Sequence, residues 1–266
     1  MSDFLQEMAT LSAERAASVS VESNDLDKTV VPLQLDHFDV IAEIKDHSPS
    51  EGDLAPAAYD RATQAQHYAA GGAAAISVLT EPSRFLGELQ HIEEVVAALP
   101  ATPVMRKDFL VEPVQILEAR AAGASGVLLI VTMLSDAKLR SMLDCAQDHD
   151  LFVLLESFDE DDLSRLANSM NTDDLDRAES GQLLFGVNTR NLRTLAVDPD
   201  RLKNLAQSLP EGRCVAESGL NTAADAARVA ALGYSVALVG SALMRSDDPA
   251  ALVASMRKDG AEGLAA

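Results

Sequence analysis

Positive charge, aromatic side chains and cysteine are all scarce in this sequence. Its 266 residues carry 21 basic side chains against 42 acidic ones, which gives a formal net charge of −21, and they include no tryptophan and only two cysteines. A chain this acidic repels polyanions, so neither nucleic acid nor an anionic membrane surface is an expected partner. No apolar run approaches the ~18 residues of a membrane-spanning helix, and the partly acidic N-terminus is not typical of a signal peptide.

The residues that hold metals or form disulfides are also few and scattered. Cys145 and Cys214 lie far apart within apolar segments, which is typical of proteins of the reducing cytoplasm. The sequence contains no CxxC and no HExxH motif, which gives structural zinc little support. The excess of acid is consistent with simple solubility. Because only six of the 21 basic residues are lysine, adaptation to a salty medium is the alternative.

What the sequence does have is a repeat of short apolar runs separated by helix-like segments. Most of the runs are continuously apolar, as strands buried on both faces should be. Segments such as Pro113–Gly123 begin with proline and stop at glycine, which is typical of helices. The eight runs are Val40–Lys45, Ala74–Thr80, Thr102–Asp108, Gly126–Thr132, Leu151–Ser157, Leu183–Thr189, Arg213–Gly219 and Val236–Ser241.

Eight strand–helix units predict an α/β fold, a (β/α)8 TIM barrel, with a doubly wound open sheet as the alternative. We expect one domain over residues 1–266, in which residues 1–38 form an N-terminal helical extension and residues 39–258 the barrel. The extension should contain a helix near Asp3–Ser18. The polar, acidic stretch Asn168–Gln182 predicts a mobile surface loop.

Charged and polar residues close several of the apolar runs. Active sites of TIM barrels lie at the C-terminal ends of the strands, so these side chains would meet at the barrel mouth. Structural ion pairs are the alternative, but charges at five strand ends favour a site, because each carries a desolvation cost. Gly219 and Gly240 follow the seventh and eighth strands, where such barrels often hold phosphate. The polar residues are Glu43, Lys45, Lys107, Glu156, Asn188, Arg190 and Glu217.

Five runs between Val40 and Arg245 are distinctive. In order they are AEIKDHSPSEG, ISVLTEPSRFLG, PVMRKDFLVEPVQILEARAAGASGVLLI, GVNTRNLRTLAVD, and VAESGL followed by VALVGSALMR. Together they resemble the indole-3-glycerol-phosphate synthase family of tryptophan biosynthesis. The resemblance implies a carboxy-lyase that needs neither metal nor cofactor. It would convert 1-(2-carboxyphenylamino)-1-deoxyribulose 5-phosphate to indole-3-glycerol phosphate, CO2 and water.

The resemblance also implies roles for the charged residues. Lys107 would protonate the substrate carbonyl oxygen and meet the substrate carboxylate. Glu156 would act as the base and Lys45 as the second acid of the dehydration, although the sequence leaves open which lysine serves which step. Glu43 and Glu217 would hold the lysines in place and stabilise positive charge that develops on the substrate nitrogen.

The remaining matched residues would bind the substrate. Asn188 matches a contact to the sugar hydroxyls or the leaving group, and Arg190 matches a residue that pairs with carboxylates of the barrel mouth. Ser50 is a further binding candidate. Those that match phosphate contacts are Ser48, Ser218, Gly219, Gly240 and Ser241. Those that match the apolar slot for the aromatic ring are Pro49, Phe85, Phe109, Leu128 and Leu220.

The sequence departs from the family pattern at Asp46, His47 and Glu51, where basic residues are usual. Asp46 and Glu51 should bring negative charge to the phosphate site and weaken anion binding at low salt. The rest of the acidity should lie on outer helices and on residues 168–182. The N-terminal extension fits the family pattern too poorly to name a contact.

Two other functions remain open. One is a different barrel enzyme acting on a phosphorylated sugar, such as a phosphoribosylanthranilate isomerase. That enzyme relies on an Asp and Cys pair at strand ends, and neither Cys145 nor Cys214 is suitably placed. The other is a barrel kept as a binding scaffold. The expected partner is a small phosphorylated molecule, and the chain should be a cytoplasmic monomer or weak dimer.

Overall fold

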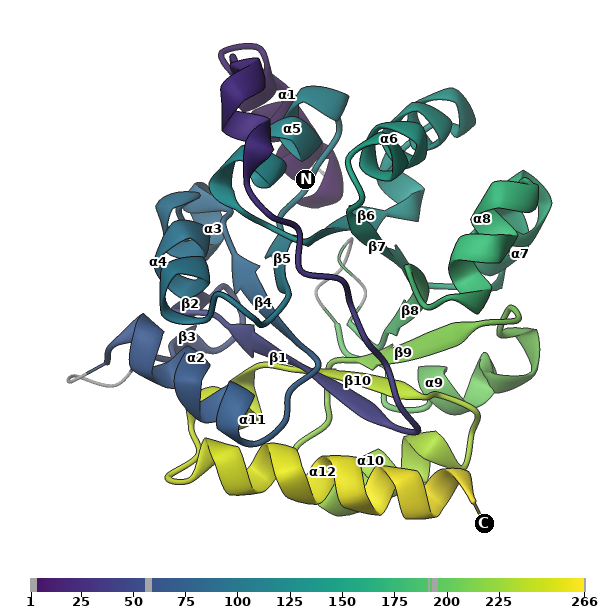
Figure 1. Cartoon of the computed structure of the whole chain (residues 1–266). Coiled ribbons are helices and arrows are strands. Elements are labelled where there is room, and N and C mark those ends of the chain that lie inside the picture. The colour runs from purple at the N-terminus through teal and green to yellow at the C-terminus, as the bar shows by residue number, and fades with distance from the viewer. Residues whose placement is uncertain (1–3, 56–58, 191, 193–195, 266) are drawn as a thin grey trace.

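Eight parallel strands close into a barrel in a computed structural model, which describes residues 4–55, 59–190, 192 and 196–265 (Figure 1). The closed ring confirms the predicted TIM barrel and excludes the open sheet. Each observed strand falls within or beside one of the eight apolar runs. Around the ring the strands are β1 (Asp39–Ile44), β4 (Ala75–Leu79), β5 (Val104–Lys107), β6 (Gly126–Ile130), β7 (Phe152–Ser157), β8 (Leu183–Asn188), β9 (Arg213–Glu217) and β10 (Val236–Val239).

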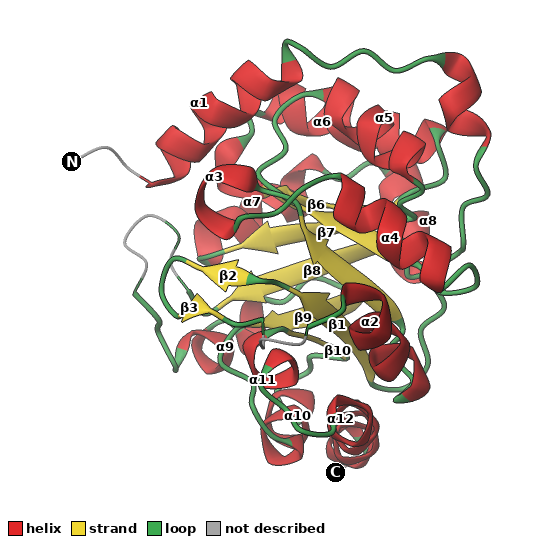
Figure 2. Ribbon diagram, turned by 90° about the vertical axis from the view of Figure 1, so that its left-hand side faces the viewer, coloured by secondary structure: helices red, strands yellow, loops and turns green. Residues whose placement is uncertain are grey.

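Helices surround this ring, and a short hairpin lies at one end. Figure 2 shows the hairpin, formed by β2 (His47–Ser48) and β3 (Gly52–Asp53), on the side to which the barrel strands point. The outer helices are α2 (Arg61–Ala70), α4 (Gln90–Ala98), α5 (Pro113–Ala122), α6 (Asp136–Asp148), α7 (Glu160–Ser169), α8 (Thr172–Glu179), α10 (Ala223–Ala230) and α12 (Pro249–Leu264). Shorter helical turns are η1 (Ser23–Asp27), α3 (Pro82–Phe85), η2 (Val131–Met133), α9 (Arg201–Asn204), η3 (Ala206–Ser208) and α11 (Ser241–Met244).

Alternation along the strands decides which side chains enter the barrel. Successive side chains of a strand point to opposite faces, so residues two apart share a face. Ile41, Met105, Leu154 and Val215 belong to the core inside the ring. Two residues further along the same strands come Glu43, Lys107, Glu156 and Glu217. The apolar floor of the barrel therefore continues directly into a charged layer at the C-terminal ends of the strands.

The N-terminal extension contains the predicted helix, α1 (Phe4–Ala16). Its buried side chains are Leu5, Met8, Ser12 and Ala16, which recur at helical spacing and form one face. Leu5 and Met8 join the core cluster that fills the barrel, so α1 covers the barrel rather than extending away from it.

Residues 168–182 are not the loop that the sequence predicted. They contain the end of α7 and all of α8, whose Asn171 caps the helix by accepting the backbone N–H of Asp174. The Asp174 carboxylate is fully buried and accepts hydrogen bonds from Arg140 of α6. Polar residues here cap a helix and form an ion pair with a neighbouring helix, so the segment has the composition of a loop although it is helical.

Candidate active site

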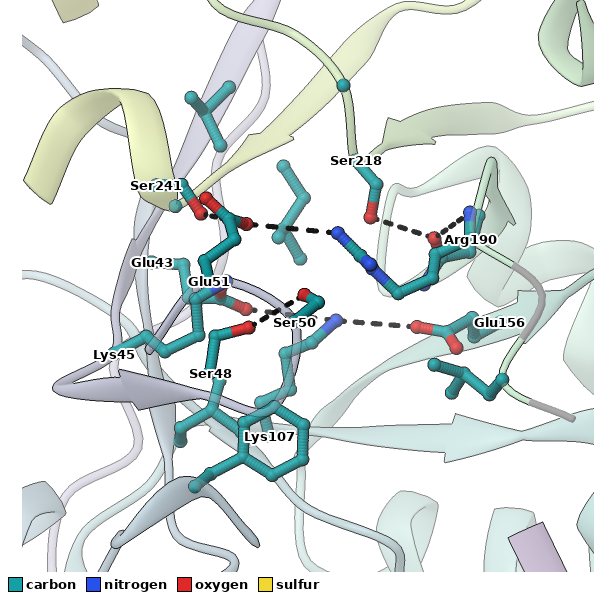
Figure 3. A pocket seen from close by; sticks show the side chains of 18 of the residues that line it. Glu43, Lys45, Ser48, Ser50, Glu51, Lys107, Glu156, Arg190, Ser218 and Ser241 are labelled. Carbon is teal, nitrogen blue, oxygen red and sulfur yellow. Dashed lines mark hydrogen bonds and ion pairs between the residues drawn. The ribbon is translucent and has the colours of Figure 1, made fainter. Parts of the chain in front are cut away.

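Three buried carboxylates, those of Glu43, Glu156 and Glu217, surround Lys107 at the end of β5. Figure 3 shows Lys107 with Glu43 and Glu156. Its Nζ lies 3.0 Å from Glu217 Oε2, 3.3 Å from Glu156 Oε2 and 3.9 Å from Glu43 Oε2. The four residues come from β5, β9, β7 and β1, so barrel closure brings them together. The side chains of Glu43, Glu156 and Glu217 are between 1% and 4% exposed, too little for water to replace the lysine as their partner.

A second lysine shares one of these carboxylates. Lys45 Nζ lies 2.9 Å from Glu43 Oε1, so Glu43 bridges the two ammonium groups. Burial alone would raise the pKa of Glu43, but Lys45 and Lys107 together outweigh it and lower that pKa below its usual value. Glu43 is therefore the ionised member that holds both lysines at the pocket floor.

Opposing effects also set the protonation of Lys107 and Glu217. Burial favours a neutral amine, but Glu217, Glu156 and Glu43 outweigh it and raise the pKa of Lys107 above its ordinary range. For Glu217, burial raises the pKa well above its ordinary value, opposed by Lys107 and assisted by the neighbouring Glu156, with which it shares a hydrogen bond. Lys107 is thus an ammonium, and Glu217 is the carboxyl group that most readily holds a proton.

Two glycines make room for this cluster. A Cβ at Gly186 of β8 would collide with Glu217 Oε1, and one at Gly240 would collide with Glu43 Oε1. Gly240 was predicted to contact phosphate. In the structure, the absence of a side chain at this position also leaves room for the carboxylate of Glu43. Gly186 was not predicted as part of the site. A glycine inside an apolar run does not indicate which side chain will occupy the space beside it, because that side chain comes from another strand of the closed barrel.

Every residue predicted for the site lines one pocket, except Glu217, which contacts Lys107 beneath it. The apolar wall includes Phe85 and Phe109, whose ring centroids are 6.1 Å apart. Phe4 of α1 also lines the pocket and meets Phe109 edge-on at 5.8 Å. No contact was predicted from the N-terminal extension, since nothing in its sequence says which face of α1 covers the barrel mouth.

Other residues that line the pocket are polar. Asn188 Oδ1 accepts hydrogen bonds from Ser218 Oγ at 2.8 Å and from the backbone N–H of Arg190 at 2.9 Å. Ser218 and Gly219 both have positive φ, 67° and 76°, so the chain turns sharply after β9. Ser48 and Ser50 lie across the pocket with their hydroxyl oxygens 3.1 Å apart.

Only one of the three departures from the family pattern reaches the pocket. Glu51 lines it, whereas Asp46 accepts a hydrogen bond from Arg61 at 2.6 Å and His47 pairs with Asp53 at 2.8 Å. The expectation that Asp46 intrudes on the site is therefore wrong, because Arg61 of α2 holds it elsewhere. Four carboxylates line the pocket, those of Glu43, Glu51, Asp108 and Glu156, against the three cations Lys45, Lys107 and Arg190. Most of the 42 acidic side chains of the chain therefore lie outside the pocket, as expected.

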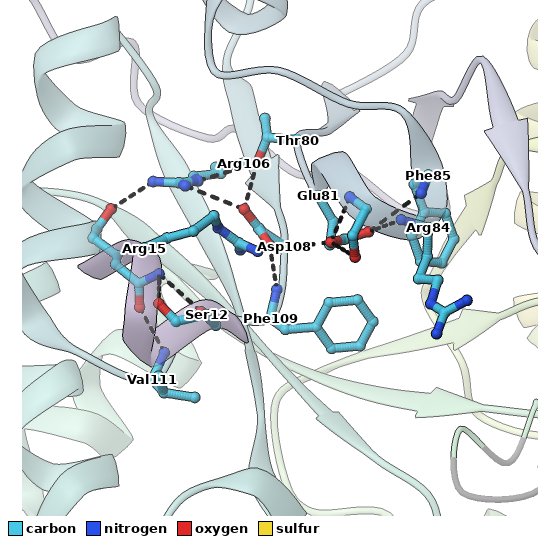
Figure 4. A network of polar contacts seen from close by, with 12 residues as sticks. Ser12, Arg15, Thr80, Glu81, Arg84, Phe85, Arg106, Asp108, Phe109 and Val111 are labelled. Carbon is cyan, nitrogen blue, oxygen red and sulfur yellow. Dashed lines mark hydrogen bonds and ion pairs between the residues drawn. The ribbon is translucent and has the colours of Figure 1, made fainter. Parts of the chain in front are cut away.

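A polar network ties α1 to the strand that carries Lys107 (Figure 4). Asp108 Oδ1 accepts hydrogen bonds from Arg15 Nη2 at 2.7 Å and from the backbone N–H of Phe109 at 2.8 Å. Its other oxygen accepts from Thr80 at 2.9 Å and Arg106 at 3.1 Å. Asp108 stands between Lys107 and Phe109, so this network fixes both. Sequence reasoning missed Arg15, whose partner lies 93 residues away.

Within the described ranges, no three His, Cys, Asp or Glu side chains are grouped to hold a metal ion. Of the helices that can be described, none is both long and apolar enough to cross a membrane.

The closed ring and the charged cluster at its carboxyl end define a TIM-barrel enzyme. A solved structure of 3-hexulose-6-phosphate synthase from Salmonella typhimurium is similar in fold, with a TM-score of 0.64 over 85% of this chain and 99% of that one. Thiamine phosphate pyrophosphorylase from Pyrococcus furiosus gives a TM-score of 0.59 over 86% and 98%. Both are 15% identical to this chain, so the likeness concerns the fold alone.

Sequence comparison is more specific. The family model described as indole-3-glycerol phosphate synthase matches residues 5–256. The indole-3-glycerol phosphate synthase of Nocardioides sp. (strain ATCC BAA-499 / JS614) is 44% identical, covering 94% of this chain and 92% of the relative. That of Mycobacterium tuberculosis (strain CDC 1551 / Oshkosh) is 40% identical, covering 92% and 88%. The chain belongs to the indole-3-glycerol phosphate synthase family, which confirms the predicted family and enzyme class, a carboxy-lyase of tryptophan biosynthesis.

Proposed function

We propose that this chain converts 1-(2-carboxyphenylamino)-1-deoxyribulose 5-phosphate to indole-3-glycerol phosphate, CO2 and water, through the residues of this pocket. The observation that carries the assignment of roles is the position of Lys107 among Glu43, Glu156 and Glu217 at the pocket floor. One domain, residues 1–266, does this work, with 1–38 as the extension and 39–258 as the barrel. It acts in the cytoplasm as a monomer or weak dimer, without a cofactor and without nucleic acid as a partner.

The two walls of the pocket orient the substrate. The aromatic ring lies in the slot formed by Pro49, Phe85, Phe109, Leu128 and Leu220. The phosphate is bound by Ser48, Ser50, Ser218, Gly219, Gly240 and Ser241. Asn188, held by Ser218 and by the Arg190 backbone, contacts the sugar hydroxyls, and Arg190 closes the polar side. This orientation places the substrate carbonyl and carboxylate over Lys107.

Ring closure is the first chemical step. The ring carbon that bears the carboxylate attacks the C2 carbonyl carbon, and the carbonyl oxygen takes a proton from the Lys107 ammonium. The raised pKa of Lys107 keeps this acid charged. The transfer still runs forward, because an alkoxide is a stronger base than an amine. The bond to the carboxylate then breaks, CO2 leaves and its electron pair restores the aromatic ring.

Dehydration completes the indole. Lys45 protonates the C2 hydroxyl, which leaves as water, while Glu156 removes a proton from C1 and a C1–C2 double bond forms. Glu217 lies beside Glu156, and burial raises the pKa of Glu217 well above its ordinary value. The carboxylate of Glu43 holds Lys45 and Lys107 together and stabilises positive charge on the substrate nitrogen.

Incubation of the full chain with this substrate tests the proposal, with indole fluorescence as the readout. We expect fluorescence to rise at a rate proportional to protein concentration. A parallel incubation with N-(5′-phosphoribosyl)anthranilate tests the isomerase alternative. Absence of indole product across a salt series would contradict the proposal, and turnover of the second compound alone would favour the isomerase.

A further inference from the structure

Glu51 places a carboxylate in the part of the pocket to which phosphate binding is assigned. Its Oε1 accepts a hydrogen bond from Ser241 Oγ at 2.9 Å, and its Oε2 lies 2.8 Å from Arg245 Nη1. Arg190 Nη2 lies 3.8 Å from Oε1 on the other side (Figure 3). A hydroxyl and two guanidinium groups therefore converge on one carboxylate.

The Ser241 hydroxyl and the two guanidinium groups are typical ligands of a phosphate group. Hydroxyl and guanidinium donors bind phosphate oxygens and carboxylate oxygens in the same way, so the two anions compete for one set of donors. Two anions in the same place repel each other, and the side chain of Glu51 is 24% exposed, within a pocket that screens charge weakly. Substrate phosphate and Glu51 cannot both occupy the contacts with Ser241 and Arg190.

The position of Glu51 in the hairpin allows its side chain to move out of the pocket. Glu51 lies between β2 and β3, and its backbone N–H donates to the Ser48 carbonyl. The next residue, Gly52, has φ of 72° and open space around the position of a Cβ. The side chain of Glu51 is already 24% exposed, so it can rotate toward solvent, and Arg245, itself 54% exposed, can follow it.

We propose that Glu51 is a resident anion, which occupies the phosphate subsite in the free protein and is displaced by the phosphate group of the substrate. The inference rests on the proposed function and deepens it by naming the residue that sets phosphate affinity. Because the competing carboxylate belongs to the same chain, its effective concentration is high and every phosphate that binds must first displace it. A dianionic phosphate, with more charge and more acceptor oxygens, displaces it better than a carboxylate ligand does.

The test compares Glu51→Gln with Asp53→Asn. Both substitutions remove one negative charge from the same hairpin, but Asp53 pairs with His47 and is not among the pocket-lining residues. We expect Glu51→Gln to lower KM about tenfold and to strengthen competitive inhibition by inorganic phosphate by a similar factor, with kcat within about twofold. Asp53→Asn should change each value less than about twofold. Glu51→Ala should shift KM in the same direction as Glu51→Gln.

If Glu51 instead helps to bind the substrate, its substitution will have the opposite effect on KM. If Glu51 orients Ser241 and Arg190 for the substrate, both Glu51 variants will raise KM and weaken phosphate inhibition, and the proposal is overturned. An unchanged KM in Glu51→Gln also overturns it. Calorimetric titration of the wild type and of Glu51→Gln with inorganic phosphate separates this inference from the proposed function. Tighter phosphate binding by the variant supports the resident anion even if the wild type forms no indole.

Discussion

Lys107 Nζ lies 3.0 Å from Glu217 Oε2, and this contact sets the charge state of the pocket floor. Three buried carboxylates and two lysines meet there, so full ionisation would leave an excess negative charge in a poorly hydrated place. The raised pKa of Glu217 removes that excess by keeping a proton. The pocket floor therefore holds a charged acid, Lys107, next to the carboxyl group of Glu156.

Glu217→Gln should therefore make the protein more stable at alkaline pH and less active. Because the folded pKa of Glu217 is raised, its contribution to stability is present at low pH and is lost as pH rises through that pKa. We expect a gain of about 1–2 kcal/mol in the free energy of unfolding at pH 8, little gain near pH 4.5, and turnover lowered at least about tenfold. Urea unfolding at the two pH values measures the difference, and an equal loss of stability at both would contradict the protonation assigned to Glu217.

Glu156→Gln should separate the last chemical step from the earlier ones. If Glu156 removes the C1 proton, its amide replacement still permits ring closure and loss of CO2 but blocks dehydration. In a single turnover we expect CO2 to be released while indole fluorescence lags by about a hundredfold or more in rate. The assignment fails if CO2 release and indole formation slow by the same factor, because Glu156 would then act before decarboxylation.

Arg15→Met should weaken catalysis from outside the pocket. Arg15 positions Asp108, which in turn fixes the backbone between Lys107 and Phe109. We expect KM to rise about fivefold and kcat to fall several-fold, since small displacements of reacting groups are costly. Arg228→Met is the matched control, because Arg228 is an exposed residue of α10 that pairs with Asp225 on the same helix. Equal kinetics in both variants would show that α1 does not position the strand end.

Asp174→Asn tests the ordered structure of residues 168–182. Asp174 is fully buried and paired with Arg140, so the substitution should lower the free energy of unfolding by about 1–3 kcal/mol without changing turnover. Asp173, exposed in the first turn of the same helix, gives the control. Asp173→Asn should change stability by less than about 0.5 kcal/mol. If both variants matched the wild type, α8 would not be held to α6 by this pair.

The sequence predicted the strands and the pocket because both follow from order along the chain. Continuous apolar runs are typical of buried parallel strands. When such strands close into a ring, the polar residues at their C-terminal ends meet at one end of the barrel. Lys107 and Glu217 are 110 residues apart, yet their contact follows from the topology.

Contacts of the extension and of the outer helices could not be predicted in this way. Nothing in the order of the chain directs Phe4 and Arg15 of α1 to Phe109 and Asp108. Polar capping residues make α8 resemble a loop. The position of Glu51 depends on side chains from two other segments, Arg190 after β8 and Ser241 and Arg245 of α11 and its C-cap, which only the folded structure brings together.

Turnover of Lys107→Met, compared with Lys138→Met, tests the central assignment most directly. Each variant replaces a lysine by an uncharged side chain of similar length, but Lys138 pairs with Glu112 away from the pocket. With circular dichroism showing both variants folded at the assay temperature, we expect Lys107→Met to lose about a thousandfold or more in kcat/KM and Lys138→Met to stay within about twofold of the wild type. Turnover of folded Lys107→Met within about tenfold of the wild type would contradict the role of Lys107 as the acid of ring closure.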